Sequence, residues 1–207
     1  MVDHYHPKTI IKLGDFPPPR AGVTIFNENL YNFLIKKRID FLFFIFRENE
    51  LGREKVVSIK AHNLRDLFLL IIKSHLLLFA DHAFQGKYKI CLSLKHRVRF
   101  FLKAILISKW LRKEKCYSAL CDDLGLSQII FIYLKLLGYS IDIHTYLHGA
   151  GIIEKYDKEL ALYKKLTNLS STYIVASKFM ADVYNEKKDK IDDVRICPPH
   201  CCQKEYF

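Results

Sequence analysis

The sequence predicts an α/β protein in which helices cover both faces of a mainly parallel β-sheet. Short apolar runs of strand length alternate with segments of helical periodicity along the chain. Several of these runs end in loops rich in Gly, Asp and Pro, which stop a strand. With 207 residues, 50% of them hydrophobic, the chain has the length and composition of one domain with a sizeable buried core. We therefore expect residues 1–207 to form a single domain.

The first elements predict a unit of strand, helix and strand. A short apolar strand over Thr9–Leu13 leads into residues 14–22, a loop rich in proline and glycine that continues neither strand nor helix. Apolar residues then recur at helical spacing from Val23 to Arg38. The run Asp40–Phe46 is almost entirely apolar, which is typical of a strand buried on both faces of a parallel sheet. Two parallel strands joined in this way require a right-handed crossover.

The centre of the chain has a weaker pattern. We expect a strand at Val56–Ile59 and a helix at Asn63–Phe79. Residues Lys89–Leu94 fit either another strand or the lead into the next helix.

The alternation returns after residue 116. We expect a strand at Tyr117–Cys121, a helix from Leu126 to Leu137 that Gly138 stops as its C′ residue, and a strand at Ser140–Leu147. The same alternation predicts a helix at Asp157–Leu169 and a strand at Thr172–Ala176. A helix at Lys178–Asn185 follows, with Ser177 as its N-cap, and the last element is a strand at Val194–Cys197.

The charge of the chain favours an anionic partner. The formal net charge is +11, with an isoelectric point near 9.3. Basic residues concentrate between Leu94 and Lys115, which we read as a helix. Lys95, Arg99 and Lys103 share one line of that helix, continued by Trp110. A basic face with a Trp is typical of a helix on an anionic membrane, and a core helix with a solvated basic face explains the pattern equally well.

Several classes of protein and site are not favoured. The first fifteen residues lack the pattern of a secretory signal, and no apolar stretch reaches the roughly 20 residues of a membrane span. A cytoplasmic protein, attached at most to the inner membrane surface, is therefore expected. Cys197, His200, Cys201 and Cys202 are spaced poorly for a tetrahedral zinc site, so we expect no bound metal. The sequence has no Walker A, G-x-G-x-x-G, G-x-S-x-G or H-E-x-x-H motif.

Candidate ligand-binding residues follow the predicted strands. Ligands of open parallel sheets bind outside the carboxyl ends of the strands. Gly22 stands at the start of a helix, where free amides favour a phosphate, although a simple tight turn explains it as well. His148 follows a strand and could present a ring nitrogen to a ligand, although a lone histidine, like His144 in the same strand, is more often structural. Asp122 and Asp123 are adjacent and point to opposite sides of a strand end, so they do not form a carboxylate pair.

Four segments of the sequence, in order, resemble segments of one known protein family. The segment from Leu13 to Thr24 resembles an opening strand, a proline-bearing loop and a Gly-Gly-Val/Ile helix start. Tyr146-Leu147-His148-Gly149 resembles a strand that ends in His-Gly. Residues Tyr173 to Met180 resemble an aliphatic strand followed by Ser, Glu/Lys and Phe, and residues from Val194 to Phe207 resemble the entry to an interdomain linker. In this order the segments resemble the N-terminal, acceptor-side domain of family 4 (group 1) glycosyltransferases of the GT-B type.

The resemblance implies a Rossmann-like domain and a retaining transfer of a sugar from a nucleotide sugar, the co-substrate, to an acceptor glycan or lipid-linked sugar. Gly22, with Ala21, would offer amides to the donor phosphates, and His148 would contact the donor sugar and stabilise charge. Arg20, Asp122 and Lys178 are candidates for the acceptor side by position. No bound cofactor or catalytic metal is implied.

The sequence departs from the family in three respects. Ala21 replaces the first of the paired glycines, and Pro199 to Cys202 replace the Asn-Gly-Val-Asp of the linker entry. The chain also ends where the family begins its second domain, which binds the donor. The resemblance therefore implies a half enzyme that is inactive without a donor domain, missing or supplied by another chain.

Two other functions remain as alternatives. The first is a non-catalytic peripheral membrane or partner-binding module that keeps the fold. The second is a nucleic-acid binder, which only the net charge of +11 motivates, because no RRM, KH or zinc-finger pattern is present. The basic segment is also too apolar on its other side for a free recognition helix, so nucleic acid is the least favoured partner.

Overall fold

The computed structural model describes residues 8–16, 22–46, 52–59, 82, 93–122, 126–147, 172–175, 177–187 and 194–196. Within these residues the chain forms a seven-stranded sheet in which every neighbouring pair of strands is parallel. The strand order is β3-β2-β1-β4-β5-β6-β7. This arrangement confirms the predicted Rossmann-like α/β class.

The strands and helices lie close to the predicted ranges. The strands are β1 (Thr9–Leu13), β2 (Phe41–Ile45), β3 (Val56–Ser58), β4 (Cys116–Asp122), β5 (Ser140–Leu147), β6 (Thr172–Val175) and β7 (Val194–Ile196). The helices are α1 (Gly22–Lys36), α4 (Leu94–Ser108), α5 (Leu126–Leu136) and α8 (Lys178–Lys187). The predicted helices at 63–79 and 157–169 lie outside the described residues, as does the segment 89–92.

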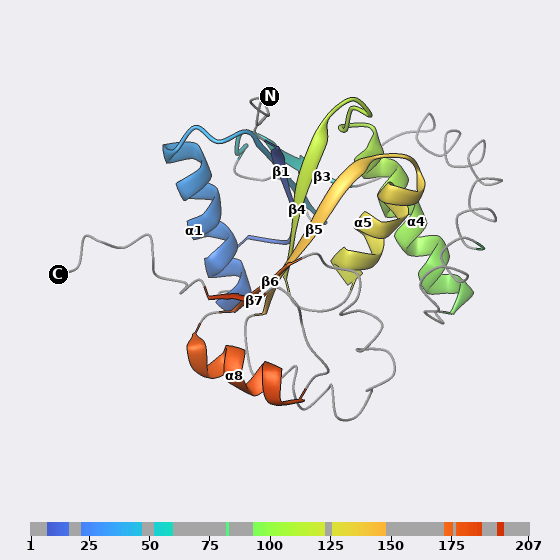
Figure 1. Cartoon of the computed structure of the whole chain (residues 1–207). Coiled ribbons are helices and arrows are strands. Elements are labelled where there is room, and N and C mark those ends of the chain that lie inside the picture. The colour runs from blue at the N-terminus through green and yellow to red at the C-terminus, as the bar shows by residue number, and fades with distance from the viewer. Residues whose placement is uncertain are drawn as a thin grey trace, which may run out of the picture.

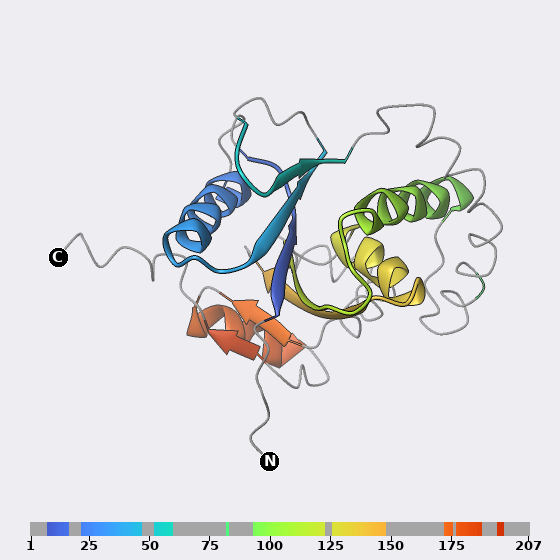
Figure 2. The same ribbon diagram turned by 90° about the horizontal axis from the view of Figure 1, so that it is seen from above.

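The two faces of the sheet are covered by different helices (Figure 2). Helix α1 packs on one face, where Leu34 meets Phe41 and Phe43 of β2. Helices α4, α5 and α8 pack on the other face in one larger core, which includes Phe101 and Ile130. The right-handed crossover rule explains this division, because the chain moves one way across the sheet from β1 to β3 and the opposite way from β3 to β7.

Strand β2 shows why an apolar run becomes a central strand. Phe41 and Phe43 belong to the core beneath α1, whereas Phe44 belongs to the core on the opposite face. Side chains alternate between the faces of a strand, so a strand covered on both faces needs apolar residues at successive positions. The prediction from the continuous apolar run is therefore confirmed.

Two predicted helix boundaries are confirmed in their local geometry. Gly138 follows α5 with a φ of 90°, a left-handed conformation that costs glycine little and lets the chain turn into β5. The backbone N–H of Met180 donates to the Ser177 hydroxyl oxygen at 3.3 Å, so Ser177 caps α8 as its sequence position predicts.

Helix α4 is shorter than the predicted basic helix. It ends at Ser108, so Trp110 lies in the connection to β4 and not on the helical line of Lys95, Arg99 and Lys103. Leu111 is only 7% exposed and packs into the core, which turns the chain away from the helix axis. The Tyr139 hydroxyl also donates to the Ser108 carbonyl at 3.1 Å, which satisfies one carbonyl of the last turn.

Candidate functional site

The point where the strand order reverses lies between β1 and β4. The chain places β2 and β3 on one side of β1 and then returns to place β4 on its other side. Connections leave the carboxyl ends of β1 and β4 toward opposite faces, so ligands of open α/β sheets commonly bind there. We call the carboxyl ends of β1, β2 and β4, with the start of α1, the carboxyl rim (lower edge in Figure 1).

A buried ion pair joins the two strands at this rim. The Lys12 ammonium of β1 pairs with the Asp122 carboxylate, the last residue of β4. The Lys12 side chain is 0% exposed, and the Asp122 side chain is 13% exposed. A buried charge without a partner is very unfavourable, so this pairing permits a lysine inside the sheet. Asp122 is thus the member of the pair that a ligand at the rim can reach.

Gly14 allows α1 to approach this pair. A Cβ atom on Gly14 would lie 2.7 Å from the Asn27 amide nitrogen and 3.1 Å from an Asp122 carboxylate oxygen. Asn27 of α1 is fully buried, and its side-chain amide donates to the Asp15 carbonyl at 2.9 Å. The close fit fixes α1 against the carboxyl ends of β1 and β4. It therefore sets where the first residues of α1 stand relative to Asp122.

The rim extends to the end of β2. The backbone N–H of Phe46 donates to an Asp15 carboxylate oxygen at 3.3 Å, and the N–H of Gly14 donates to the Phe44 carbonyl at 3.1 Å. These bonds tie the ends of β1 and β2 together. Lys103 of α4 places its ammonium nitrogen 3.4 Å from the centre of the Phe46 ring, a cation–π contact.

Lys103 differs electrostatically from an ordinary surface lysine. Burial, followed by repulsion from Arg99, lowers the pKa of Lys103 from 10.5 to about 8, and attraction to Asp15 opposes this shift. Lys103 therefore belongs to the surroundings of the carboxyl rim and is half-buried. Arg99 and Lys95, one and two helical turns earlier, are exposed.

The thiol beside Asp122 is not a nucleophile in this fold. Cys121 is fully buried on the opposite face of β4, in the core that α4 and α5 cover. Burial raises the pKa of this thiol to about 12, against the smaller lowering effect of its bond with Ser127. The thiol stays protonated at neutral pH and lies on the face of β4 away from Lys12.

The structure places only some of the predicted site residues. Gly22 is the first residue of α1, Asp122 ends β4, and Lys178 is exposed at the start of α8. The other predicted ligand-binding and metal-capable residues lie outside the described part of the chain, and they are Arg20, Ala21, His148, Cys197, His200, Cys201 and Cys202. Within the described residues, no group of three or more His, Cys, Asp or Glu side chains could hold a metal ion.

Sequence reasoning missed Lys12 and Asn27. The available signal for Lys12 was a charged residue inside the otherwise apolar strand Thr9–Leu13, at a position that faces a covering helix. Lysine is almost never fully buried without a partner, so such a position calls for a carboxylate on a neighbouring strand. Asn27 lies next to Phe26 in α1, and no sequence pattern marks it as buried. It is buried because the helix approaches the sheet closely at Gly14.

Comparisons with known proteins do not name a family. No protein-family model matches the sequence, and a search of the curated proteins finds no match. In the described part of the chain, none of the helices is both long and apolar enough to cross a membrane.

Proposed function

We propose that the chain is the acceptor-side domain of a retaining glycosyltransferase, which acts with a donor-binding domain to transfer a sugar from a nucleotide sugar to a glycan or a lipid-linked acceptor. The observation that carries the proposal is the carboxyl rim, where the all-parallel sheet brings the end of β1, the start of α1 and Asp122 together. This is the edge at which the four family-like segments of the sequence leave their strands. A Rossmann-like fold alone would support many functions, so the resemblance supplies the choice of reaction.

Each predicted site residue has a role in this proposal. The amides of Gly22 and Ala21 approach the donor phosphates, helped by the positive end of the α1 dipole. His148 contacts the donor sugar near the reacting carbon. The bond from this carbon to the diphosphate oxygen breaks, and a bond to the acceptor hydroxyl oxygen forms with the same configuration. The hydroxyl proton passes to the leaving diphosphate.

Asp122 is suited to hold the acceptor. Its carboxylate is 13% exposed, and Lys12 and Gly14 fix its position from below. A carboxylate in this setting accepts a hydrogen bond from an acceptor hydroxyl without having to be ordered at the moment of binding. Arg20 and Lys178 complete the acceptor side in the proposal.

Binding of the donor phosphates can be tested by NMR on the full 207-residue chain. UDP-glucose and GDP-mannose serve as probes, and amide shifts are followed as either nucleotide sugar is added. We expect shifts at Gly22 and Val23, and weaker binding in His148→Ala. The matched control is His96→Ala, because His96 is exposed on α4. Absence of shifts at the start of α1, or equal affinity in all three proteins, contradicts the proposal.

The need for a donor domain gives a second test. The purified chain should transfer no labelled sugar from UDP-glucose or GDP-mannose to a lipid extract. Sustained transfer by this chain alone would contradict the half-enzyme proposal. A chain that binds neither donor, and whose interactions survive His148→Ala, would instead fit the non-catalytic module.

A further inference from the structure

The connections that lead into the amino ends of the strands carry much of the positive charge of the chain. In a parallel sheet these connections share one edge, the upper edge in Figure 1, opposite the carboxyl rim. We define the amino-end surface as the exposed basic side chains of this edge, which are Lys8, Lys36, Lys37, Arg38, Lys55, Lys109, Arg112, Lys113, Lys115 and Lys135. Three exposed acids, Asp40, Glu54 and Glu114, lie among these ten bases. The edge therefore contributes a large share of the +11 net charge.

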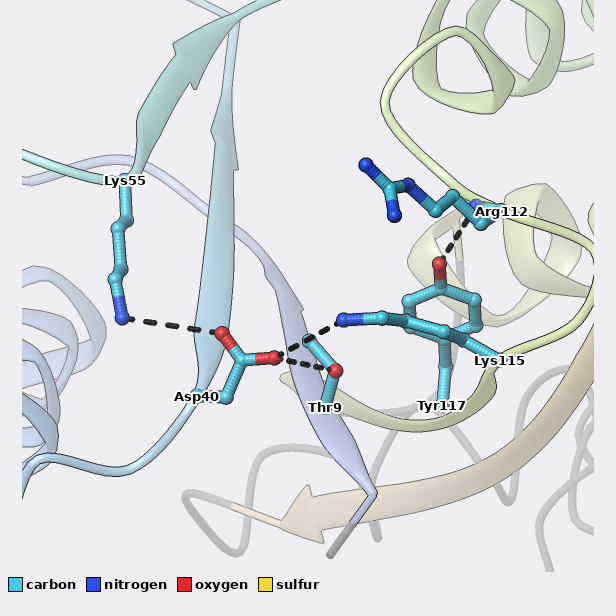
Figure 3. A network of polar contacts seen from close by, with 6 residues as sticks. All are labelled: Thr9, Asp40, Lys55, Arg112, Lys115 and Tyr117. Atoms are coloured by element: carbon cyan, nitrogen blue, oxygen red, sulfur yellow. Dashed lines mark hydrogen bonds and ion pairs between the residues drawn. The ribbon is translucent and has the colours of Figure 1, made fainter.

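Asp40 pairs with two lysines in the middle of this surface, but its single negative charge does not neutralise the surface. Its carboxylate accepts a hydrogen bond from the Thr9 hydroxyl at 2.7 Å and lies 3.8 Å from the Lys55 ammonium and 3.6 Å from the Lys115 ammonium. Figure 3 shows the two lysines on either side of Asp40, with Arg112 on the same connection as Lys115. One carboxylate thus serves two lysines, and the exposed bases of the surface outnumber its exposed acids.

The α4–β4 connection presents its charges from a fixed backbone. The Arg112 backbone N–H donates to the Tyr117 hydroxyl at 2.7 Å, and the Leu111 side chain is buried in the core (Figure 3 shows the first contact). Trp110 lies between these anchors and the end of α4, and it is 56% exposed. A large aromatic side chain is therefore held outward among Lys109, Arg112 and Lys113.

We propose that the amino-end surface binds an anionic membrane, with Trp110 in the headgroup region and the basic side chains against the lipid phosphates. Anionic lipid attracts such a surface by about 1 kcal/mol for each basic residue near it. Trp favours the boundary between water and lipid because its ring is apolar and its N–H is polar. The inference rests on the observed surface and does not depend on the proposed transferase activity.

The composition of the surface favours lipid over other polyanions. Eight of the ten basic residues are lysine, which is depleted at protein–protein interfaces. Nucleic-acid recognition commonly uses Arg forks and several aromatic platforms, whereas Trp110 is the one exposed aromatic side chain among the described residues of this edge. A diffuse lysine-rich charge with one interfacial Trp matches the requirements of a lipid surface.

The same observations move the membrane contact away from α4. The predicted line of Lys95, Arg99 and Lys103 ends in Lys103, which is half-buried over Phe46 at the carboxyl rim. Trp110 belongs to the opposite edge, because α4 ends before it. The two surfaces can therefore be separated by mutation.

Intrinsic fluorescence tests the contact without any mutation, since Trp110 is the only tryptophan of the chain. Vesicles with about one-third phosphatidylglycerol should shift the emission to shorter wavelength and allow quenching by brominated lipid, and the effect should fade as salt rises from about 0.05 M to about 0.5 M. Vesicles of phosphatidylcholine alone should have little effect. No change with either vesicle would overturn the proposal.

Two triple variants identify the surface by vesicle co-sedimentation. Lys109→Gln, Arg112→Gln and Lys113→Gln together should weaken binding to phosphatidylglycerol vesicles on the order of a hundredfold. The matched control carries Lys95→Gln, Arg99→Gln and Lys103→Gln, which remove the same charge from α4, and it should bind within about threefold of the unmodified chain. Circular dichroism checks that both fold. Equal losses, or a larger loss in the control, would overturn the assignment.

A nucleic-acid partner is the remaining outcome of the same assay. Single-stranded RNA and duplex DNA oligonucleotides are titrated while the Trp110 emission is recorded. Under the proposal they respond less than the vesicles at equal salt. A response to RNA or DNA at salt concentrations where phosphatidylglycerol vesicles give none would overturn the proposal in favour of nucleic acid.

Discussion

The two ends of the sheet use the same pair of residue types in opposite ways. At the carboxyl rim, Lys12 is 0% exposed and bound to Asp122, which is itself 13% exposed. At the amino end, Lys55 and Lys115 stand about half-exposed beside Asp40 at 3.8 and 3.6 Å. Loss of one member of the rim pair would leave an unpaired buried charge, which lowers the free energy of unfolding strongly. The exposed pairs of Asp40 contribute little to stability. The rim pair therefore has a fixed geometry, whereas the charges of the amino end stay exposed to solvent.

The largest effect is expected from breaking the buried pair. Asp122→Ala leaves the Lys12 ammonium inside the sheet without its carboxylate, so we expect a loss of about 3 to 5 kcal/mol in the free energy of unfolding. For a chain of this length the melting temperature should fall by roughly 10 °C. Urea unfolding followed by circular dichroism measures the free energy of unfolding, and thermal unfolding measures the melting temperature.

A second variant separates pairing from packing. The double variant Lys12→Met and Asp122→Val removes both charges, and it should recover much of the lost stability because neither ion remains buried. A loss below about 1 kcal/mol in Asp122→Ala would show that Lys12 finds another acceptor or water. That result would also remove the argument that Lys12 positions Asp122 for an acceptor.

The next effect concerns the close fit around the same pair. Gly14→Ala places a Cβ atom 2.7 Å from the Asn27 amide nitrogen, so we expect a loss of about 1 to 3 kcal/mol. The double variant Gly14→Ala and Asn27→Ala removes the closest clash, and its loss should be smaller than the sum of the single losses. Additive losses would mean that Asn27 does not restrict the space at Gly14.

The sequence predicted features that depend on neighbouring residues, but not those that depend on residues far apart in the chain. β1 and β5 begin and end where predicted, because apolar runs and turn residues are local signals. Ser177 and Gly138 are confirmed for the same reason. The pairing of Lys12 with Asp122 depends on which strands become neighbours. No local pattern contains that information.

The basic segment between residues 94 and 115 shows a second limit of prediction from sequence, the position of charged residues in space. The charges between residues 94 and 115 read as one helical surface, yet the turn at Leu111 divides them between the two ends of the sheet. Whether Leu111 packs inward depends on the core beneath it, which the sequence of the segment does not reveal. Charge composition thus predicted an anionic partner, but the positions of the charges required the fold.

A smaller effect is expected at Lys103, the basic residue nearest the rim. Arg99→Gln removes the repulsion that lowers the pKa of Lys103, so this pKa should rise from about 8 but stay below 10.5, because burial is the larger cause. NMR titration of the lysine side chains measures it. An unchanged pKa in Arg99→Gln would show that Arg99 does not influence Lys103.

The same shift gives stability a defined dependence on pH. Between about pH 8 and 10.5 the unfolded chain holds the Lys103 proton and the folded chain does not, so the contribution of this group to stability rises with pH across that window. In Arg99→Gln the folded pKa of Lys103 lies closer to 10.5, so the pH window is narrower and stability should rise less across it. A larger rise in Arg99→Gln than in the unmodified chain would contradict the prediction, because it would mean that Arg99 raises the pKa of Lys103.

The smallest effect is expected at the amino end. Lys55→Gln removes a solvent-exposed pair with Asp40 and also relieves repulsion among the neighbouring bases, so stability should change by no more than about 0.5 kcal/mol. Asp40→Asn removes the one carboxylate between Lys55 and Lys115, and we expect a loss of about 0.5 to 1 kcal/mol at low salt that shrinks at high salt.

Salt is therefore the variable that separates the two ends. The loss in Asp122→Ala should persist at high salt, because ions cannot screen a pair that water hardly reaches, while the loss in Asp40→Asn should fade. Urea unfolding of both variants at about 0.05 M and about 1 M salt makes the comparison. If both losses faded equally, the Lys12–Asp122 pair would be as accessible to solvent as the amino-end pairs, and the distinction between a fixed rim and an available charged surface would fail.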